Sequence, residues 1–219
     1  MPHRLQKEIS KLYDKILKLG TIVEKRVKDV IYALQNRDVN LAKSVIEKDS
    51  EINEMEVEIE EECLKVLALY QPVAIDLRIL AAIIKINNDL ERVGDEAVNI
   101  GQRILTIVKY PPPSLSLEFN KMAEEVEGML RLSLDSLVYR DVNLAYKVCK
   151  MDPVVDEINW NNYRLIRDAI KSEPEMTEPL INMLLISRHL ERIADHATNI
   201  AEDIIYIIKG EIPRHRITL

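Results

Sequence analysis

Two twelve-residue segments of this chain, 100 positions apart, follow the same pattern. Residues 89–100 read DLERVGDEAVNI, and residues 189–200 read HLERIADHATNI. A shorter segment also repeats, because residues 37–42 and residues 140–145 both read RDVNLA. Repeats that keep their order along the chain indicate one supersecondary unit that occurs twice. The chain is therefore expected to fold as two similar halves.

The composition and the spacing of the apolar residues predict long helices. Only five of the 219 residues are Gly, which favours helices over sheets and turns. In and after each repeat, apolar residues recur at alternating steps of three and four, the pattern of a helix with one buried face. The two seams are Leu90, Val93, Ala97, Ile100, Ile104 and Ile107, and Leu190, Ile193, Ala197, Ile200, Ile204 and Ile207. Such seams pack at shallow angles in helix bundles.

Capping residues predict where the helices begin and end. Asp38 and Asp141 are suited to cap the second helix of each half, because a short acceptor side chain satisfies free backbone N–H groups. Gln71–Pro72 separates the second helix from the third, since proline is tolerated in a first helical turn. The third helices are expected at about residues 73–109 and 178–209.

Proline marks two further interruptions. Residues 110–114 contain three consecutive prolines, which cannot continue a helix and therefore form a linker. Pro153 falls inside the second helix of the second half, where it should break or kink the helix, or restart it behind Asp152. We predict an all-α fold of six long helices in two tandem, pseudo-symmetric three-helix bundles, residues 1–112 and 113–219.

The third helix of each half carries a row of oxygen-bearing side chains. Because they are four residues apart, they lie along one side of the helix, beside the apolar seam. The rows are Glu91, Asp95 and Asn99, and Glu191, Asp195 and Asn199. The second helix of each half adds matching donors, which are Asp49, Asn53 and Glu54, and Asp152, Asp156 and Glu157. Facing helices of this composition could bind Mg²⁺, Mn²⁺, Ca²⁺ or oxidised iron rather than zinc.

Ion pairing is the alternative explanation of these rows, and the spacing alone favours it. Arg92 and Arg192 follow the first acid of each row, and Arg–carboxylate pairs commonly join helices. The spacing leaves both explanations open. Two histidines of the second repeat are expected to be solvated surface residues rather than metal ligands. They are His189 and His196, at the positions of Asp89 and Glu96 in the first repeat.

Charge and cysteine content disfavour several classes of protein. The net charge is −7 and no basic stripe is present, so nucleic acid is not an expected ligand. No apolar run approaches the ~20 residues of a membrane span, so direct membrane insertion is not expected. Cys63 and Cys149 occupy unmatched positions and are expected to be free thiols of a cytoplasmic protein. No Glu-x-x-His pair occurs, which disfavours a ferritin-like oxidase.

Several separated motifs resemble the PhoU family. They are residues 49–56 with Ile59, 71–78, 90–95, 190–195, 199–200, and 206–210 with Arg214 and His215. The resemblance spans nearly the whole chain and implies a fold of two three-helix bundles. It also implies that some members of the family bind clusters of iron or other metal ions. It implies that the metal-binding acids are Glu91 with Asp95 and Glu191 with Asp195, and that Asp49, Asp152 and Asp156 accompany them. This chain departs from the family pattern at Ala194, where the family often has Gly. Asn53 also stands at the position that Asp156 occupies in the second half, so the two sites are expected to differ.

The resemblance also implies a regulatory function. Proteins of the PhoU family link the phosphate ABC transporter, through its ATPase subunit, to a sensor histidine kinase, and they repress the starvation response when phosphate is plentiful. We therefore expect a non-enzymatic cytoplasmic regulator that is peripheral at the inner face of the membrane through the transporter and forms a homodimer. The alternatives are a carboxylate-ligated metal-dependent hydrolase or oxidase, in which the ion activates a water, and a metal buffer.

Overall fold

The computed structural model describes residues 2–113 and 115–211. The elements are α1 (Pro2–Asn36), α2 (Val39–Glu47), α3 (Ser50–Tyr70), α4 (Ala74–Ile107), α5 (Phe119–Tyr139), α6 (Val142–Ser172), a short 3₁₀ helix (Pro174–Met176) and α7 (Thr177–Lys209). No strand occurs in this part of the chain, and the prediction of an all-α fold is confirmed. Ser114, Arg214 and His215, which contributed to the sequence argument, lie outside the described residues.

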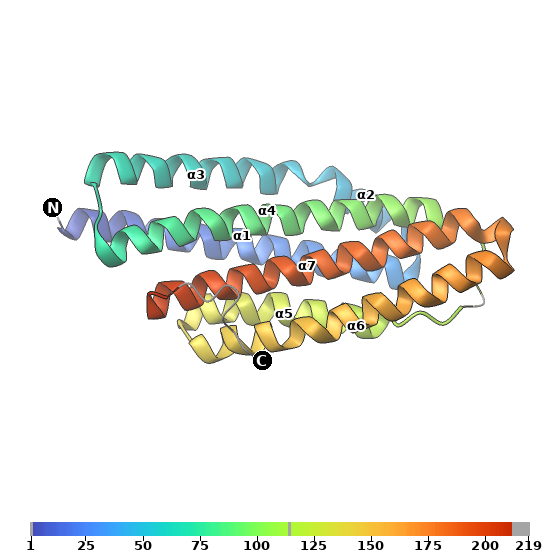
Figure 1. The fold of residues 1–219 in the computed structure, drawn as a ribbon. Coiled ribbons are helices and arrows are strands. Elements are labelled where there is room, and N and C mark those ends of the chain that lie inside the picture. The colour runs from blue at the N-terminus through green and yellow to red at the C-terminus, as the bar shows by residue number, and fades with distance from the viewer. Residues whose placement is uncertain (1, 114, 212–219) are drawn as a thin grey trace.

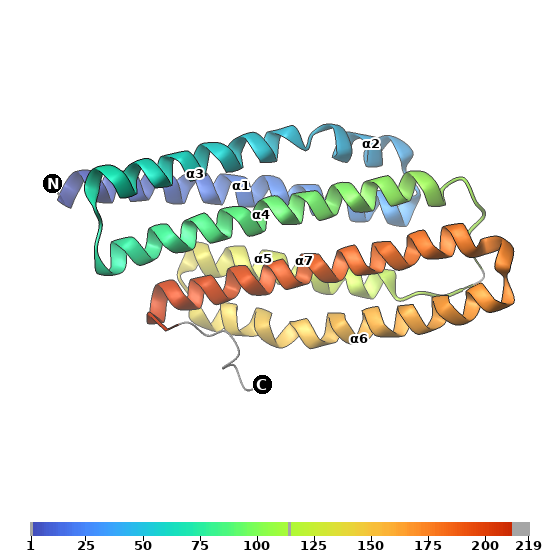
Figure 2. The same cartoon turned by 45° about the horizontal axis from the view of Figure 1, so that its top comes forward.

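The helices form two bundles that lie side by side (Figure 1). The first contains α1 to α4 and the second contains α5 to α7, so the predicted pair of three-helix bundles is confirmed. The third helices, α4 and α7, pack against each other across the middle of the molecule and run in opposite directions (Figures 1 and 2). Within the described ranges, no helix has both the length and the apolar character required to cross a membrane.

The apolar seams of α4 and α7 form the centre of the two cores. All twelve seam residues named above are buried, and the most exposed of them, Ile207, retains only 8% of its surface. The seam of each third helix is therefore covered by the neighbouring helices, as the three-and-four spacing predicts. The flank of each helix is left for polar side chains.

The predicted caps are confirmed in both halves. The Asp38 carboxylate accepts hydrogen bonds from the backbone N–H groups of Asn40 and Leu41, at 2.9 and 3.0 Å. The Asp141 carboxylate accepts one from Asn143 at 2.8 Å. Each cap satisfies backbone donors that have no partner inside the helix.

The second helix is divided in the first half and continuous in the second, although only the second contains a proline. α6 continues through Pro153, so a break or restart there is wrong, and a tolerated kink stays a prediction. The break lies between α2 and α3, at Lys48 and Asp49. Arg26 of α1, only 6% exposed, donates hydrogen bonds to backbone carbonyls of the broken turn, at 3.3 Å from Lys48 and 3.5 Å from Val45.

The residue that faces the turn explains this difference between the halves. The RDVNLA segments are offset by 103 residues, so Arg26 corresponds to Met129, which is buried in the second half. A guanidinium group satisfies carbonyls that a broken helix leaves unpaired, whereas a thioether cannot donate hydrogen bonds. The arginine therefore stabilises the interruption that places Asp49 at the start of α3.

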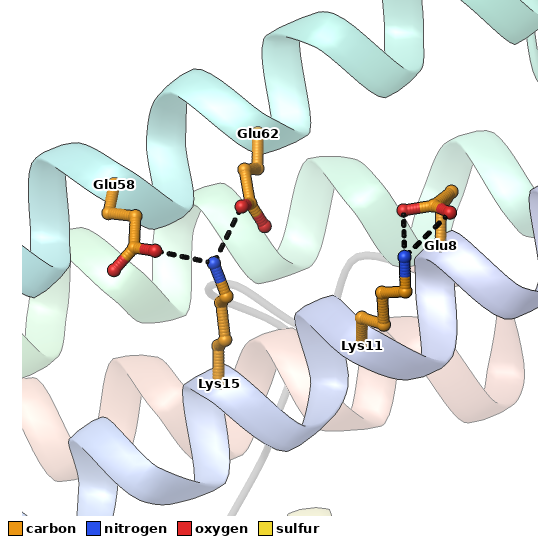
Figure 3. A network of polar contacts seen from close by, with 5 residues as sticks. All are labelled: Glu8, Lys11, Lys15, Glu58 and Glu62. Carbon is orange, nitrogen blue, oxygen red and sulfur yellow. Dashed lines mark hydrogen bonds and ion pairs between the residues drawn. The ribbon is translucent and has the colours of Figure 1, made fainter.

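A lysine on α1 fixes the position of α3. Figure 3 shows Lys15 between two glutamates of α3, with its Nζ 2.8 Å from Glu58 and 2.6 Å from Glu62. Lys11 pairs with Glu8 within α1 itself. Because Lys15 binds two side chains one helical turn apart, it favours one rotation of α3 about its axis. The face of α3 that carries Asp49 is then directed toward α4.

Candidate metal sites

Four carboxylates gather where α3 meets α4. Acidic cluster one consists of Asp49 and Glu56 from α3, and Glu91 and Asp95 from α4. Partial burial, with the negative charges of Asp95, Glu56 and Asp49, raises the pKa of Glu91. Partial burial and the charges of Asp49 and Glu96 likewise raise the pKa of Asp95. The four acids thus repel one another and favour an added positive charge.

Four carboxylates also gather where α6 meets α7. Acidic cluster two consists of Asp152 and Asp156 from α6, and Glu191 and Asp195 from α7. Burial and the charges of Asp195, Asp156 and Asp152 raise the pKa of Glu191 from 4.5 to about 7, although Arg188 acts in the opposite direction. Burial and neighbouring acids raise the pKa of Asp195 and of Asp152 as well.

The two clusters hold the same number of acids at slightly different positions. Asn53 and Glu56 of α3 correspond, with the offset of 103, to Asp156 and Asn159 of α6. The fourth carboxylate is therefore shifted by about one helical turn between the halves. Glu56 was not among the predicted donors, although it follows Asp49 by seven residues and so lies on the same side of α3.

Each cluster contains one buried carboxylate oxygen that has no hydrogen-bond partner among residues 2–113 and 115–211. These atoms are Oδ1 of Asp49 and Oε2 of Glu191. The other Asp49 oxygen accepts a hydrogen bond from Asn53 at 3.0 Å, and Asp152 accepts one from Thr198 at 3.1 Å. A buried anionic oxygen without a donor is costly, and a cation would satisfy it. The donor sets fit an oxygen-preferring ion.

The carboxylate side chains of the two clusters are not arranged around a common ion position. No three His, Cys, Asp or Glu side chains of residues 2–113 and 115–211 stand in positions that would hold a metal. Cation binding at either cluster therefore requires the carboxylates to rotate toward one another. Asp95 and Asp195 are exposed, so each cluster is open to solvent on one side.

The arginines of the repeats do not neutralise these acids. Arg92 donates to Asn88 on its own helix at 3.0 Å, and Arg192 pairs with Glu96 of the other bundle at 2.9 Å. Only Glu191 has an ion-pair partner in its cluster, which is the largely exposed Arg188. Within residues 2–113 and 115–211, neither Arg92 nor Arg192 forms a direct ion pair with an acid of the rows, although the charges of both lower the pKa of Asp95.

The polar groups between the bundles instead join α4 to α7. Nδ1 of His189 lies 2.6 Å from Glu96, and Nδ1 of His196 lies 2.8 Å from Asp89. Position 89 of one repeat thus contacts position 196 of the other, and position 96 contacts position 189, so the pairs are related by the pseudo-symmetry of the halves. Although burial acts against it, hydrogen bonds from His189 and Asn99 and the charge of Arg192 hold the pKa of Glu96 below its ordinary value.

The two histidines and the two asparagines of the repeats lie at this contact between the bundles. The expectation that both histidines are solvated is wrong, because His196 is 9% exposed and the His189 side chain 12%. The sequence contained a signal for this contact, because both histidines of the second repeat stand at positions that carry acids in the first repeat. The amide of Asn199 donates to Asp89 at 3.2 Å, and Asn99 bonds Glu96, so both asparagines belong to the contact between the bundles as the side chains stand.

Comparison with known proteins gives the family. A family model described as the PhoU domain matches residues 5–104 and 119–204. A phosphate-specific transport system accessory protein PhoU homolog of Aquifex aeolicus is 38% identical over 213 residues, covering 97% of this chain and 96% of the relative. This chain belongs to the PhoU family. The corresponding PhoU homolog of Clostridium acetobutylicum is 34% identical over 207 residues, with 94% of each chain covered.

Solved structures of PhoU proteins have the same fold. The crystal structure of PhoU from Pseudomonas aeruginosa matches with a TM-score of 0.91 at 35% identity, covering 94% of this chain and 99% of that one. The phosphate transport system regulatory protein PhoU from Streptococcus pneumoniae matches with a TM-score of 0.83 at 28% identity, covering 95% and 98%. The resemblance inferred from the motifs is confirmed, and the two acidic clusters are features of a PhoU-family fold.

Proposed function

We propose that this PhoU-family chain is a metal-binding, non-enzymatic regulator of phosphate uptake. It links the ATPase subunit of a phosphate ABC transporter to a sensor histidine kinase and represses the starvation response when phosphate is plentiful. It acts in the cytoplasm, at the inner face of the membrane through the transporter. The names of the relatives support an accessory or regulatory role in phosphate transport. The finer assignment to these partners rests on the family resemblance.

The observation that supports the metal-binding part is the pair of four-carboxylate clusters, in which the mutual repulsion of the acids raises the pKa of Glu91, Asp95, Glu191 and Asp195. Cluster one would hold a cation with Asp49, Glu56, Glu91 and Asp95, and cluster two with Asp152, Asp156, Glu191 and Asp195. All donors are carboxylate oxygens, which suits iron, Mg²⁺, Mn²⁺ or Ca²⁺. A bound ion supplies positive charge between two helices of one bundle. The acids of α3 and α6 then attach these outer helices to α4 and α7.

Elemental analysis of the native protein tests this part directly. Wild-type protein is compared with Glu91→Ala/Asp95→Ala and with Glu191→Ala/Asp195→Ala, each of which should lose the ion of one cluster. Asp14→Asn/Glu124→Gln is the matched control, because both acids are exposed and lie outside the two clusters, on α1 and α5. Metal content of zero in the wild type, or equal content in all four proteins, would refute the metal sites.

A reporter of the phosphate-starvation response tests the regulatory part. Deletion of the gene should switch the reporter on in high phosphate, and the wild-type chain should switch it off again. A chain with both double substitutions should fail to repress, while the Asp14→Asn/Glu124→Gln control should repress fully. An unchanged reporter after deletion contradicts the regulatory role, whatever the metal content.

The enzymatic alternative is tested separately. Metal-loaded protein is incubated with phosphomonoesters and with oxidisable substrates, and we expect no turnover above that of the free ion. Turnover that disappears in the cluster substitutions would replace the regulator by a metal-dependent hydrolase or oxidase. Release of stoichiometric metal to a weak chelator within minutes would instead support a metal buffer.

A further inference from the structure

One end of the molecule carries a group of exposed apolar side chains, at the turn between α3 and α4. The beginning of α1 and the end of α7 lie at the same end (Figures 1 and 2). The apolar tip consists of four side chains that are between 46% and 74% exposed: Leu69, Val73, Ile75 and Leu77. Exposed apolar side chains that gather in one place commonly mark a contact site. Three of the four belong to the segment 71–78, which contributes nothing to the acidic clusters.

The backbone of this turn is strained. Gln71 and Ala74 have φ values of 46° and 51°, in the left-handed region that residues with a side chain rarely adopt. This conformation is costly, and it holds Val73 and Ile75 in solvent, where they gain little from packing. A strained turn that directs apolar side chains outward is expected where another molecule is bound.

A shallow groove runs beside the apolar tip, between the start of α4 and the end of α7. Its volume is about 600 Å³, and it is lined by Ala74, Ile75, Leu77, Arg78, Ala81 and Tyr206. Arg78 is the only charged residue among the described residues that line it. The groove is therefore an apolar surface that contains one cation.

Arg78 is held in this groove without an anionic partner. Its guanidinium group stands over the ring of Tyr206, 5.9 Å from the ring centroid. Gly210 leaves room for the group, because a Cβ at this position would overlap Nη1 of Arg78. Within residues 2–113 and 115–211, Arg78 forms no ion pair, and its buried Nε has no hydrogen-bond partner. A buried N–H group without an acceptor is costly, and a carboxylate would satisfy it.

The neighbouring lysine shows what Arg78 lacks. Lys85 also stands against the ring of Tyr206, at 5.7 Å from the centroid, but its Nζ pairs with Asp203 at 3.0 Å. Both cations therefore share one ring, and only the lysine has an acid beside it in the described part of the chain. An acid of another molecule can supply the missing partner of Arg78.

We propose that the apolar tip and the groove bind an amphipathic helix of a partner protein, which packs apolar side chains on Val73, Ile75 and Leu77 and pairs a carboxylate with Arg78. A helix presents apolar and acidic groups one turn apart on the same side. Strand addition is disfavoured, because the described part of the chain has no sheet edge. An anionic membrane surface is also disfavoured, because the net charge is −7 and the groove contains a single cation.

This inference rests on the proposed regulatory function, because it names the surface through which a regulatory partner is recognised. It does not involve the acidic clusters, which lie farther along α3 and α4. Variants of the apolar tip should therefore keep the metal content of the wild type. They should also keep its free energy of unfolding, because the substituted side chains are exposed.

Binding of two purified proteins to the immobilised full-length chain tests this surface. They are the ATPase subunit of the transporter and the cytoplasmic region of the kinase. Val73→Ser/Ile75→Ser should weaken the affinity for at least one of them about tenfold or more. Arg78→Gln should weaken the same affinity, whereas Arg78→Lys should retain part of it because it keeps the charge. Tyr32→Ser/Ile181→Ser, which changes exposed apolar residues at the opposite ends of α1 and α7, is the control and should bind as wild type.

The outcomes separate this inference from the function on which it rests. If the wild type binds a partner and the tip variants bind it equally well, docking at the tip is overturned while the regulatory function stands. If the wild type binds neither partner, docking is overturned as well. An unchanged starvation reporter after deletion of the gene would then refute the regulatory function too.

Two further measurements identify a different occupant of the apolar tip. Sedimentation velocity over a concentration series shows whether Val73→Ser/Ile75→Ser abolishes an association of the chain with a second copy. Co-sedimentation with vesicles of phosphatidylcholine and phosphatidylglycerol shows whether the same variant abolishes binding to an anionic membrane surface. Either loss, when binding of both partners is unchanged, overturns the docking of a partner helix.

Discussion

Substitution of Glu191 by Gln should stabilise the metal-free protein at neutral and alkaline pH. Glu191 is 8% exposed and lies among Asp152, Asp156 and Asp195, and these surroundings raise its pKa to about 7. An acid whose pKa is raised on folding destabilises the folded protein once it ionises. Gln has the shape of the carboxyl group without the charge, so it removes that cost. It also removes the pairing with Arg188, which is worth under about 1 kcal/mol because the arginine is exposed.

The expected gain depends on pH in a defined direction. The rise of the pKa from 4.5 to about 7 corresponds to about 3 kcal/mol of lost free energy of unfolding when Glu191 is fully ionised. Below the unfolded pKa the group is protonated in both states and costs nothing. The penalty grows as the pH rises from the unfolded pKa of 4.5 through the folded pKa of about 7. It increases from under about 1 kcal/mol at pH 5 to its full value near pH 8. For a chain of this length the gain is about 6–12 °C in Tm.

Urea unfolding in the presence of a chelator measures this effect between pH 5 and pH 8. Glu175→Gln, at an exposed position of the 3₁₀ helix, is the control and should leave the free energy of unfolding unchanged. In the presence of a tightly bound cation the sign should reverse, because the carboxylate is then a ligand. If metal-free Glu191→Gln is no more stable than wild type at pH 8, the reasoning from mutual repulsion is refuted.

Three further substitutions have outcomes that the packing and the hydrogen bonds define, and each is measured by urea unfolding. Arg26→Met should cost about 2 kcal/mol, since it removes the donors of the broken turn, and an equal stability would contradict the role given to the guanidinium group. Gly94→Ala should cost about 1 kcal/mol, because its Cβ would lie 2.9 Å from Ile52, and Ile52→Val should relieve most of that cost in the double variant. Glu96→Ala should cost about 3 kcal/mol at pH 7 by leaving the buried His189 unpaired. Because the pKa of Glu96 is lowered on folding, its contribution is present above the ordinary pKa of a glutamate and is lost as the pH falls through the folded value, so the difference from Glu96→Ala should shrink in acid.

The helices could be predicted from the sequence because each depends on local information. The seams follow from the three-and-four spacing, and the caps at Asp38 and Asp141 follow from the side chains themselves. The break of the second helix depends on a distant residue. Pro153 is tolerated in α6, whereas the turn at Lys48 persists because Arg26 supplies donors from another helix. No pattern within the second helix contains that information.

The acidic sites were predictable in part for the same reason. The rows on α4 and α7 follow from periodicity, and the repeat itself indicates that α3 and α6 face them. Glu56 was missed because its counterpart, Asn159, has no charge, so the comparison of the two halves hid it. The histidines were placed wrongly because the side of a helix that is polar in one bundle was taken as solvated, whereas it forms the contact with the other bundle.

Where the two halves of the chain differ in position, they still preserve the functional groups. Each cluster keeps four carboxylates although the fourth comes from Glu56 in one half and Asp156 in the other. The contact between the bundles keeps one acid and one histidine in each pair, although the acids all lie on α4 and the histidines all on α7. Four like charges at a site attract a cation, and an acid opposite a histidine joins two helices, wherever on the adjoining turns they lie. Two copies of the first repeat would place acid against acid at both pairs, and two copies of the second would place histidine against histidine. In this chain the complementary pairs therefore arise because the first repeat supplies both acids and the second supplies both histidines.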